Sequence, residues 1–106
     1  MIARIWHGIT PADKADDYYA FLQRTGVTDY QATDGNRSVY VLRRIDGDQA
    51  HFLLLTLWDS VEAIKRFAGE DYRKAHYYPE DKDYLLEFEE HVVHYDVLLG
   101  LDETAR

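Results

Sequence analysis

An apolar run that leads directly into a helical pattern constrains this chain more than any other feature. Residues 52–58 read Phe-Leu-Leu-Leu-Thr-Leu-Trp, without the alternation of apolar and polar residues that marks a strand with one face in water. Such a run is typical of a strand covered on both faces of its sheet. Asp59 and Ser60 then offer oxygens to the free amides of a first helical turn, with Glu62 placed as in a capping box. The sequence therefore predicts a buried strand followed by a helix.

The beginning of the chain predicts another strand and another helix. Residues 1–7 form an alternating segment in which neither face is plainly polar. Thr10 and Pro11 then form a helix start, with the threonine as N-cap and the proline in the first helical position. Apolar residues recur at helical spacing until Gly26, which predicts a helix over residues 11–25.

Turn formers and one alternating segment follow this helix. Residues 27–37 are rich in turn residues, and residues 38–45 alternate well enough to form the second strand. Asp46-Gly47-Asp48 is a hairpin signal, which joins this strand to the buried one that ends at Trp58. The helix after Trp58 carries one apolar stripe, which Gly69 interrupts.

The last third of the chain predicts short helical pieces and a final strand. We expect a helical piece over residues 71–76, and a short turn that starts at Pro79 and runs through Tyr84. A strand over residues 88–99, at roughly 3.3 Å per residue, would outreach its short neighbours, and its overhang needs a pairing partner. The tail 101–106 is expected to be flexible.

This order of elements, strand-helix-strand-strand-helix-strand, predicts a ferredoxin-like α+β sheet with both helices on one face. Residues 1–100 would form a single domain, because 106 residues suit only one hydrophobic core. The other face of the sheet would be bare and apolar, and two copies packed face to face would bury it. We therefore expect a homodimer, a dimeric α+β barrel, with a pocket between sheet and helices in each subunit.

Composition excludes several classes of partner. The 12 Lys and Arg residues are outnumbered by 20 Asp and Glu, so nucleic acid and anionic membrane surfaces are poor partners for a chain of net charge -8. The absence of Cys excludes disulfides, thiolate metal sites and cysteine nucleophiles. No apolar run reaches the ~20 residues of a membrane span, and no signal-peptide pattern opens the chain, so we expect a cytoplasmic protein.

The histidines do not predict a metal site. Only His91 and His94 are close in sequence, and their spacing in a strand places them on opposite faces. Phosphate-binding glycine loops and nucleophile elbows are absent. We therefore expect neither a metal nor another cofactor. The nine tyrosines instead suggest a pocket lined by polar-tipped rings, a subunit interface, or both.

Three segments give the chain a resemblance to a known family. They are Met-Ile-Ala-Arg-Ile-Trp at residues 1–6, Leu-Thr-Leu-Trp-Asp-Ser at 55–60 and Lys-Ala-His-Tyr-Tyr-Pro-Glu-Asp at 74–81. With the order of elements, they make residues 1–99 resemble the antibiotic-biosynthesis monooxygenase-like proteins of the dimeric α+β barrel superfamily. This resemblance implies the dimeric barrel fold and oxygenase chemistry on a small molecule.

The resemblance implies different roles for two residues. Trp58 matches a tryptophan that lies near the substrate in cofactor-free members that oxygenate aromatic polyketides. Leu54 and Ile64 stand where those enzymes carry an asparagine and a tyrosine. His76 is similar to a histidine that ligates iron in haem-degrading members.

Those haem-degrading enzymes also use a helix tryptophan and an asparagine of the first strand. Phe67 occupies the first of these places, and Trp6 or His7 the second. The sequence therefore retains one characteristic residue of each of these two chemistries and lacks the others.

These considerations give a set of candidate site residues. The candidate catalytic residues are His76, His7 and Trp58. The candidate substrate-binding residues are Arg4, Trp6, Tyr18, Phe67, Tyr77, Tyr78 and His94. The segment from Tyr77 to Asp81 could form a lid over the pocket.

Each candidate also has a purely structural interpretation. Trp58 could be a core plug, and a histidine on a mainly apolar strand is more often a satisfied core residue than a catalyst. Arg4 in a central strand requires either a carboxylate such as Asp96 or a ligand anion.

Three functions remain open. The first is a cofactor-independent monooxygenase that acts on a small electron-rich aromatic such as a phenol, quinol or anthrone, with His76 or His7 handling the substrate proton. The second is a non-enzymatic dimer that binds a small hydrophobic molecule. The third is a haem-binding or haem-degrading protein.

Overall fold

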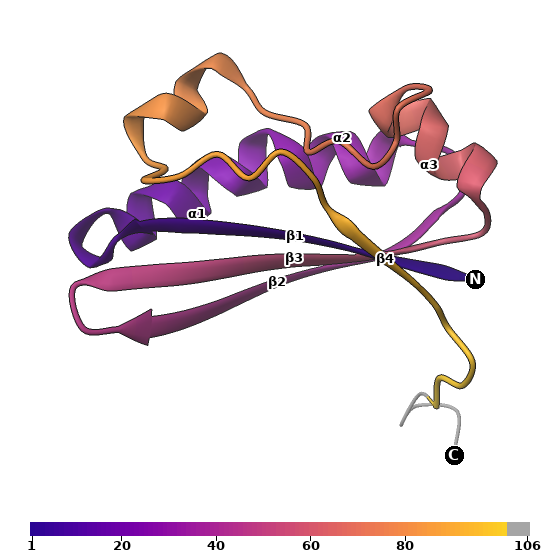
Figure 1. Cartoon of the computed structure of the whole chain (residues 1–106), viewed down its shortest axis with the longest axis horizontal. Helices are drawn as coiled ribbons and strands as arrows, with labels where there is room; N and C mark the ends of the chain where they lie inside the picture. The colour runs from indigo at the N-terminus through magenta and orange to yellow at the C-terminus, as the bar shows by residue number, and fades with distance from the viewer. Residues whose placement is uncertain (102–106) are drawn as a thin grey trace.

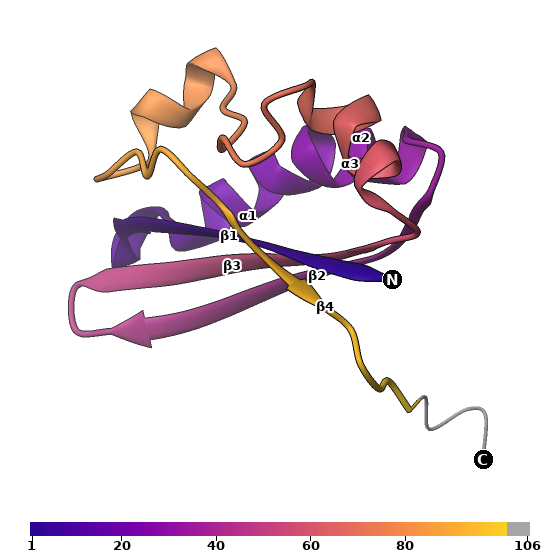
Figure 2. The same cartoon turned by 45° about the vertical axis from the view of Figure 1, so that its right-hand side comes forward.

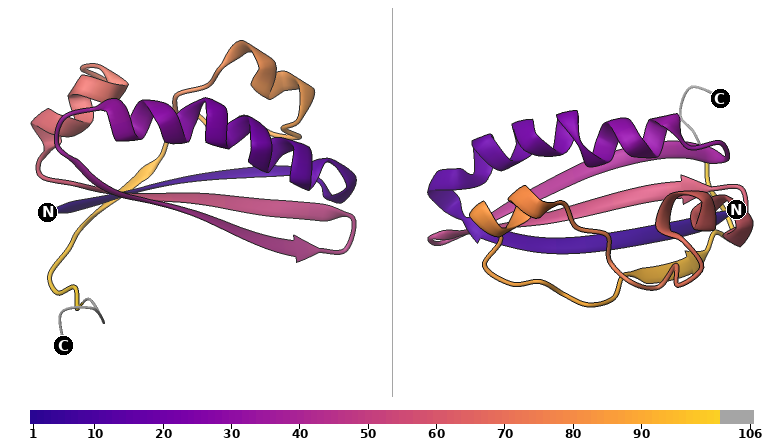
Figure 3. Two further views of the ribbon diagram at one scale, coloured as in Figure 1. Left: turned by 180° about the vertical axis from the view of Figure 1, so that it is seen from behind. Right: turned by 90° about the horizontal axis from the view of Figure 1, so that it is seen from above.

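The computed structural model describes residues 1–101 as one antiparallel sheet with helices packed on a single face (Figures 1 and 3). The strand order across the sheet is β2-β3-β1-β4, so β1 and β3 are central. This is the ferredoxin-like α+β arrangement predicted from the order of elements, and that prediction is confirmed. The bounds are β1 Ile2–Pro11, α1 Ala15–Arg24, α2 Gly26–Ala32, β2 Asn36–Asp46, β3 Gln49–Trp58, α3 Val61–Ala68 and β4 Val93–Asp96, with 3-10 turns at Ala12–Lys14 and Pro79–Asp83.

The two central strands bury one face and leave the other open. Along β3, every second residue is buried beneath the helices: Ala50, Phe52, Leu54, Thr56 and Trp58. The residues between them are only half-buried, and so are Ile5, His7 and Ile9 of β1, which share their face. Residues 52–58 were expected to be covered on both faces, but the described chain covers only one. The open face is therefore apolar and unpartnered within this chain.

The hairpin and the capped helix follow the sequence closely. β2 and β3 are joined by a tight turn in which Gly47 adopts a φ of 62°. Ser60 is the N-cap of α3, and its side-chain oxygen accepts a hydrogen bond from the Ala63 amide at 3.2 Å. Asp59 does not share this role, because its carboxylate instead pairs with Arg37 at 2.6 Å.

The first helical region differs from its prediction. Thr10 belongs to β1 and is not an N-cap, because its hydroxyl donates to the Pro11 carbonyl. Gly26 does not end the helical structure: the chain bends at Thr25 and continues as α2, so the expected turn segment 27–37 is helical through Ala32. Tyr30 accounts for this difference, since it is buried against the core and anchors α2 there.

The region before the last strand also differs. Residues 71–76 form no helix beyond one turn, because residues 73–75 run beside residues 90–92 and exchange backbone hydrogen bonds with them. The expected strand over 88–99 is confined to Val93–Asp96 for the same reason. Beyond Asp96 the chain leaves the sheet (Figure 2). The turn starting at Pro79 is confirmed, whereas the expected flexible tail lies outside the described residues apart from Leu101.

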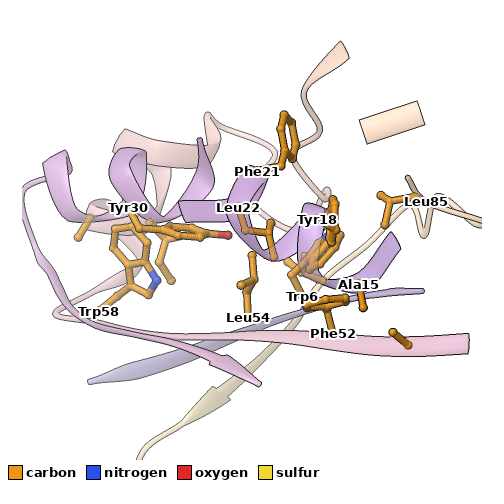
Figure 4. Packing of buried hydrophobic residues seen from close by; sticks show 14 residues of the cluster. Trp6, Ala15, Tyr18, Phe21, Leu22, Tyr30, Phe52, Leu54, Trp58 and Leu85 are labelled. Atoms are coloured by element: carbon orange, nitrogen blue, oxygen red, sulfur yellow. The ribbon is translucent and has the colours of Figure 1, made fainter. Parts of the chain in front are cut away.

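The core is a continuous aromatic layer between the sheet and the helices (Figure 4). At one end, the ring of Trp58 lies 6.1 Å from that of Tyr30 and 6.1 Å from that of Phe67. At the other end, Tyr18 packs against Phe52 and Phe21. No helix within residues 1–101 is long and apolar enough to cross a membrane.

Candidate functional site

A small cavity lies in this aromatic layer, between the sheet and the helices. Its open volume is about 20 Å³, which is room for about one water molecule. Rings and aliphatic side chains form most of its wall. The lining residues are Trp6, Tyr18, Leu22, Gly26, Tyr30, Leu54, Phe67, His76, Tyr78 and Asp81.

The floor of the cavity is made by two strand residues that face each other. Trp6 of β1 is paired with Leu54 of β3, and both point toward the helices. The Trp6 ring lies over Gly8, where an added Cβ would come within 2.3 Å of the ring atom Cη2. Gly8 is therefore needed for the position of this ring. The Trp6 Nε1 atom is buried and has no hydrogen-bond partner among the described residues.

A buried carboxylate borders the cavity. Asp81 is 3% exposed and is positioned by the 3-10 turn that Pro79 begins. Its two oxygens accept hydrogen bonds from the Tyr18 hydroxyl, at 2.9 Å, and from the Tyr78 amide, at 2.7 Å. Burial raises the pKa of the Asp81 carboxyl, and the hydrogen bonds only partly oppose this. Burial likewise raises the pKa of the Tyr18 hydroxyl, which stays protonated and donates.

His76 lies at the mouth of the cavity, on a segment with neither helix nor strand. Its ring makes edge-to-face contacts with Phe67, at 5.3 Å between centroids, and with Tyr78, at 5.1 Å. The residue is exposed, so protons can reach it from water. His76 and Asp81 both line the cavity. The mouth therefore combines a base accessible to water with a buried acid.

The Tyr78 side chain ties this mouth to α2. Its hydroxyl donates a hydrogen bond to the Asp29 carboxylate. Burial beside this carboxylate raises the pKa of the Tyr78 hydroxyl. Tyr78 therefore spans from the loop to α2.

Arg4 lies on the same face of the sheet as the cavity and is 1% exposed. Of the two partners that the sequence left open for Arg4, the carboxylate is not found: Asp96 is exposed at the sheet edge opposite Ile2, and no carboxylate of residues 1–101 pairs with Arg4. The guanidinium donates instead to the Tyr30 hydroxyl, at 3.3 Å, and to the Lys74 carbonyl, at 3.2 Å. It also lies over the Phe67 ring, 5.5 Å from the centroid.

Trp58 lies one layer behind the cavity. It is 0% exposed, and its Nε1 donates to the Thr56 hydroxyl at 2.8 Å. Its ring supports Tyr30 and Phe67, which do line the cavity. The geometry thus gives Trp58 a supporting position.

His7 lies on the open face of the sheet, on the side away from the cavity. Its Nδ1 contacts the Glu89 carboxylate, and its Nε2 lies 3.0 Å from Nδ1 of His51. The two imidazole rings are stacked, with centroids 5.3 Å apart. The sheet itself therefore separates His7 from His76.

His94 lies at the edge of the sheet, opposite Arg4, and its ring contacts Tyr72. Its Nε2 is buried without a partner among the described residues. Burial, with the nearby charges of Arg4 and Arg73, lowers the pKa of His94 to about 4.

This shift predicts a loss of stability in acid. The unfolded chain takes up a proton near a pKa of about 6.5, and the folded chain only near about 4, so stability falls as the pH drops through this window. Because His94 is partly exposed, solvent screens part of the effect, so we expect the free energy of unfolding to fall by about 1 to 2 kcal/mol. In urea unfolding, the stability that His94→Leu loses on acidification should be smaller than the loss in wild type by this amount. His91→Leu, at an exposed position, is the control, and equal acid sensitivity of His94→Leu and wild type would contradict the prediction.

The structure brings together half of the residues predicted from sequence. Five candidates line the cavity: Trp6, Tyr18, Phe67, His76 and Tyr78. Five lie elsewhere: Arg4 and Trp58 in the layer behind it, His7 on the open face, His94 at the sheet edge, and Tyr77, whose hydroxyl donates to the Glu89 carbonyl.

Sequence reasoning missed five lining residues: Leu22, Gly26, Tyr30, Leu54 and Asp81. Only Asp81 had a usable signal, since an acid two residues after Pro79 suits the first turn of a helix. Tyr30 lay in the segment expected to be turns.

No cluster of three or more metal-ligating side chains occurs within residues 1–101. The cavity's own donor set is one imidazole and one carboxylate whose two oxygens already accept hydrogen bonds.

Comparison with known proteins identifies the fold. No protein-family model and no curated protein matches the sequence. Among solved structures, a candidate antibiotic biosynthesis monooxygenase from Nitrosomonas europaea matches with a TM-score of 0.68 at 16% identity, over 93% of this chain and 100% of that chain. The chain has the fold of the antibiotic-biosynthesis monooxygenase-like proteins.

Two further structures agree with this monooxygenase-like fold. A candidate antibiotic biosynthesis monooxygenase from Bacillus cereus matches with a TM-score of 0.66 at 12% identity, over 95% of this chain and 96% of that one. The haem degrader MhuD from Mycobacterium tuberculosis, with two haems in its active site, matches with a TM-score of 0.65 at 17% identity, over 96% and 100%. The resemblance stated from sequence is confirmed for the fold, and the substrate must be argued from the site.

Proposed function

We propose that this protein is a cofactor-independent monooxygenase that acts on a small electron-rich aromatic of the phenol, quinol or anthrone type. The observation that carries the proposal is the placement of His76, a base open to water, at the mouth of an aromatic cavity bordered by a buried carboxylate. Aromatic walls favour a flat substrate, and a histidine can take up a proton near neutral pH. Solved structures of candidate monooxygenases with the same fold support this class of reaction.

In the proposed reaction His76 removes a substrate proton, and the resulting anion reduces dioxygen directly. For an anthrone-type methylene group, one oxygen atom becomes the new carbonyl and the other leaves as water with both methylene hydrogens, so no external reductant is needed. Asp81 and Tyr18 hold the turn that forms one wall. The rings around the cavity exclude bulk water from the anion, which strengthens every electrostatic interaction with it.

Substrate entry requires the cavity to open, because about 20 Å³ holds only one water. The residues between Ala75 and Tyr78 form neither helix nor strand, and Tyr78 closes the mouth through its contact with Asp29. We infer that the segment from Tyr77 to Asp81, with His76 before it, acts as the lid. Asp81 would be its fixed end, since it is buried.

Haem is a poor fit for this cavity. His76 could ligate a haem iron, but the other lining residues, among them Trp6, Leu54 and Phe67, leave only about 20 Å³ open. The open volume is far too small for a haem group without a rearrangement of this floor. We therefore assign no step to haem.

We propose that the partner is a second copy of this chain, packed against the open sheet face. The charged side chains of this face are confined to the hairpin end and to Glu89 beside His7, although the chain carries a net charge of -8. Several of its apolar side chains are substantially exposed, which is unusual for a monomer. They include Tyr40 at 53%, Leu42 at 45%, Val93 at 51% and Tyr95 at 58%.

Dioxygen uptake tests the catalytic proposal. We expect wild type to consume oxygen with at least one member of a panel of phenols, quinols and anthrones, and His76→Ala to lose about 10²-fold or more of that rate, as is typical when a general base is removed. His91→Ala is a matched control, since that histidine is exposed and is not part of the cavity lining.

Three results would separate the proposal from its rivals. Equal rates for His76→Ala and wild type would remove the histidine from the mechanism. Saturable binding of a panel member with no uptake at all would favour the non-enzymatic binding protein. A shifted haemin absorbance band that His76→Ala abolishes would favour a haem protein.

A further inference from the structure

Arg4 is a buried positive charge without a counter-ion. Its guanidinium makes two long hydrogen bonds to neutral oxygens, and its Nε is buried with no partner among the described residues. Burial lowers the pKa of the guanidinium, although arginine remains charged. Although the chain has 20 acidic residues, no carboxylate within residues 1–101 forms an ion pair with this guanidinium. An isolated buried charge is costly, so an anion supplied by a ligand would stabilise it.

Tyr30 connects this charge to the cavity. Its hydroxyl oxygen accepts a hydrogen bond from Arg4 Nη1, and no acceptor for its own hydrogen occurs among residues 1–101. The ring is 4% exposed and lines the cavity. Figure 4 shows the hydroxyl directed away from Trp58 and toward Leu22 and Leu54, which also line the cavity. Tyr30 therefore presents a free donor, polarised by Arg4, to whatever the cavity holds.

The other polar groups of the cavity agree with an anionic ligand. Trp6 also lines the cavity, and its ring packs edge-on against that of Tyr77. Asp81 is the one carboxylate in the lining, and both of its oxygens already accept hydrogen bonds from Tyr18 and Tyr78. The one carboxylate of the lining is therefore already engaged within the protein, which leaves the Tyr30 hydroxyl as the buried donor for a ligand.

We propose that the cavity binds the ionised form of an aromatic hydroxyl compound, a phenolate or enolate, whose oxygen accepts the hydrogen bond of Tyr30. Arg4 is a positioning residue that acts through this hydroxyl and supplies the compensating charge. The ligand ring lies among the aromatic walls, and its proton leaves toward His76 and water. The proposal rests on the proposed function for the aromatic class of substrate, and it adds the charge state in which that substrate is held.

The ionisation state of a bound probe tests this directly. 4-Nitrophenol absorbs differently as phenol and as phenolate, so it is mixed with the protein at a pH about one unit below the ionisation of the free probe. We expect the bound probe to show the phenolate band, with a ratio of ionised to neutral form about tenfold above that in buffer. The neutral isostere 4-nitroanisole, which cannot ionise, measures access to the cavity alone by displacement.

Variants separate the hydroxyl from the fold. Tyr30→Phe keeps the ring and should lose the phenolate band while binding 4-nitroanisole as wild type does. Arg4→Met should also lose the band, and Arg4→Lys should recover part of it because it restores the charge. Circular dichroism checks that each variant is folded. If Arg4→Met does not fold, the result for Tyr30→Phe alone tests the proposal.

Each outcome has one meaning. A phenolate band that survives in Tyr30→Phe, binding of the neutral phenol by wild type, or no binding of 4-nitrophenol at all would overturn the proposal. Phenolate binding without oxygen uptake by any panel compound would uphold it and remove the oxygenase. Oxygen uptake with no ionisation of the bound probe would uphold the oxygenase and overturn the proposal of phenolate binding.

Discussion

Replacing Trp58 with alanine should lower the free energy of unfolding by about 3 to 5 kcal/mol, as deletion of a fully buried aromatic side chain typically does. Trp58 is 0% exposed and supports both Tyr30 and Phe67, so its loss leaves a cavity that two other rings border. A domain of this size has a total stability of about 5 to 15 kcal/mol, so the variant should be close to unfolded at physiological temperature.

Urea unfolding followed by circular dichroism measures this change. Tyr19→Ala is the control, because Tyr19 is a large aromatic that is 43% exposed on α1, and it should change stability by less than about 1 kcal/mol. Trp58→Phe should fall between the two, since it keeps part of the packing but loses the hydrogen bond to Thr56. A cost below about 1 kcal/mol for Trp58→Ala would show that Trp58 is not the core plug described above.

Leu55→Lys should convert the protein from a dimer to a monomer. Leu55 lies on the open face, in register with Ile5 on one side and Tyr40 on the other, far from the charged hairpin end. A lysine there would have to be buried without a partner, at a cost of several kcal/mol for each copy. Size-exclusion chromatography with light scattering should give twice the 12.5 kDa chain mass for wild type and the chain mass for the variant.

Tyr19→Lys is the matched control for this prediction, because it places the same charge on an exposed position of the helical side. It should leave the mass of the assembly unchanged. A wild-type mass of one chain would refute the proposed partner outright. A Leu55→Lys protein that keeps the wild-type mass would place the interface on another surface.

The parts of the fold that could be predicted from the sequence are those held by local interactions. The β3 to α3 unit was predictable because its signals lie within a few residues: an apolar run, a serine N-cap and a glycine stop. The hairpin at Gly47 was predictable for the same reason. The continuation of the helix past Gly26 was not, because its cause is the burial of Tyr30 against rings from other elements.

The site was predictable only in part for the same physical reason. Residue type and period grouped Trp6 with Arg4 on one face of the first strand and placed His76 before the turn at Pro79. Sequence reasoning grouped His7 with His76 as candidate catalytic residues. Strand alternation, however, puts His7 on the opposite face of the sheet from its neighbour Trp6, which lines the cavity. Sequence reasoning left a carboxylate or a ligand anion open as the partner of Arg4, and the fold brings a tyrosine from α2 to it instead of a carboxylate.

The sequence by itself determined the order of elements, the ferredoxin-like fold, the apolar nature of both sheet faces, and the exclusion of disulfide and thiolate chemistry. These follow from periodicity, local capping and composition, which act over a few residues. Only the tertiary structure decided that Tyr30, Asp81 and His76 meet at one cavity, and that Arg4 is left without a counter-ion beside it. Such contacts depend on the packing of segments as far as 70 residues apart, as for Arg4 and Lys74, and no local pattern encodes them.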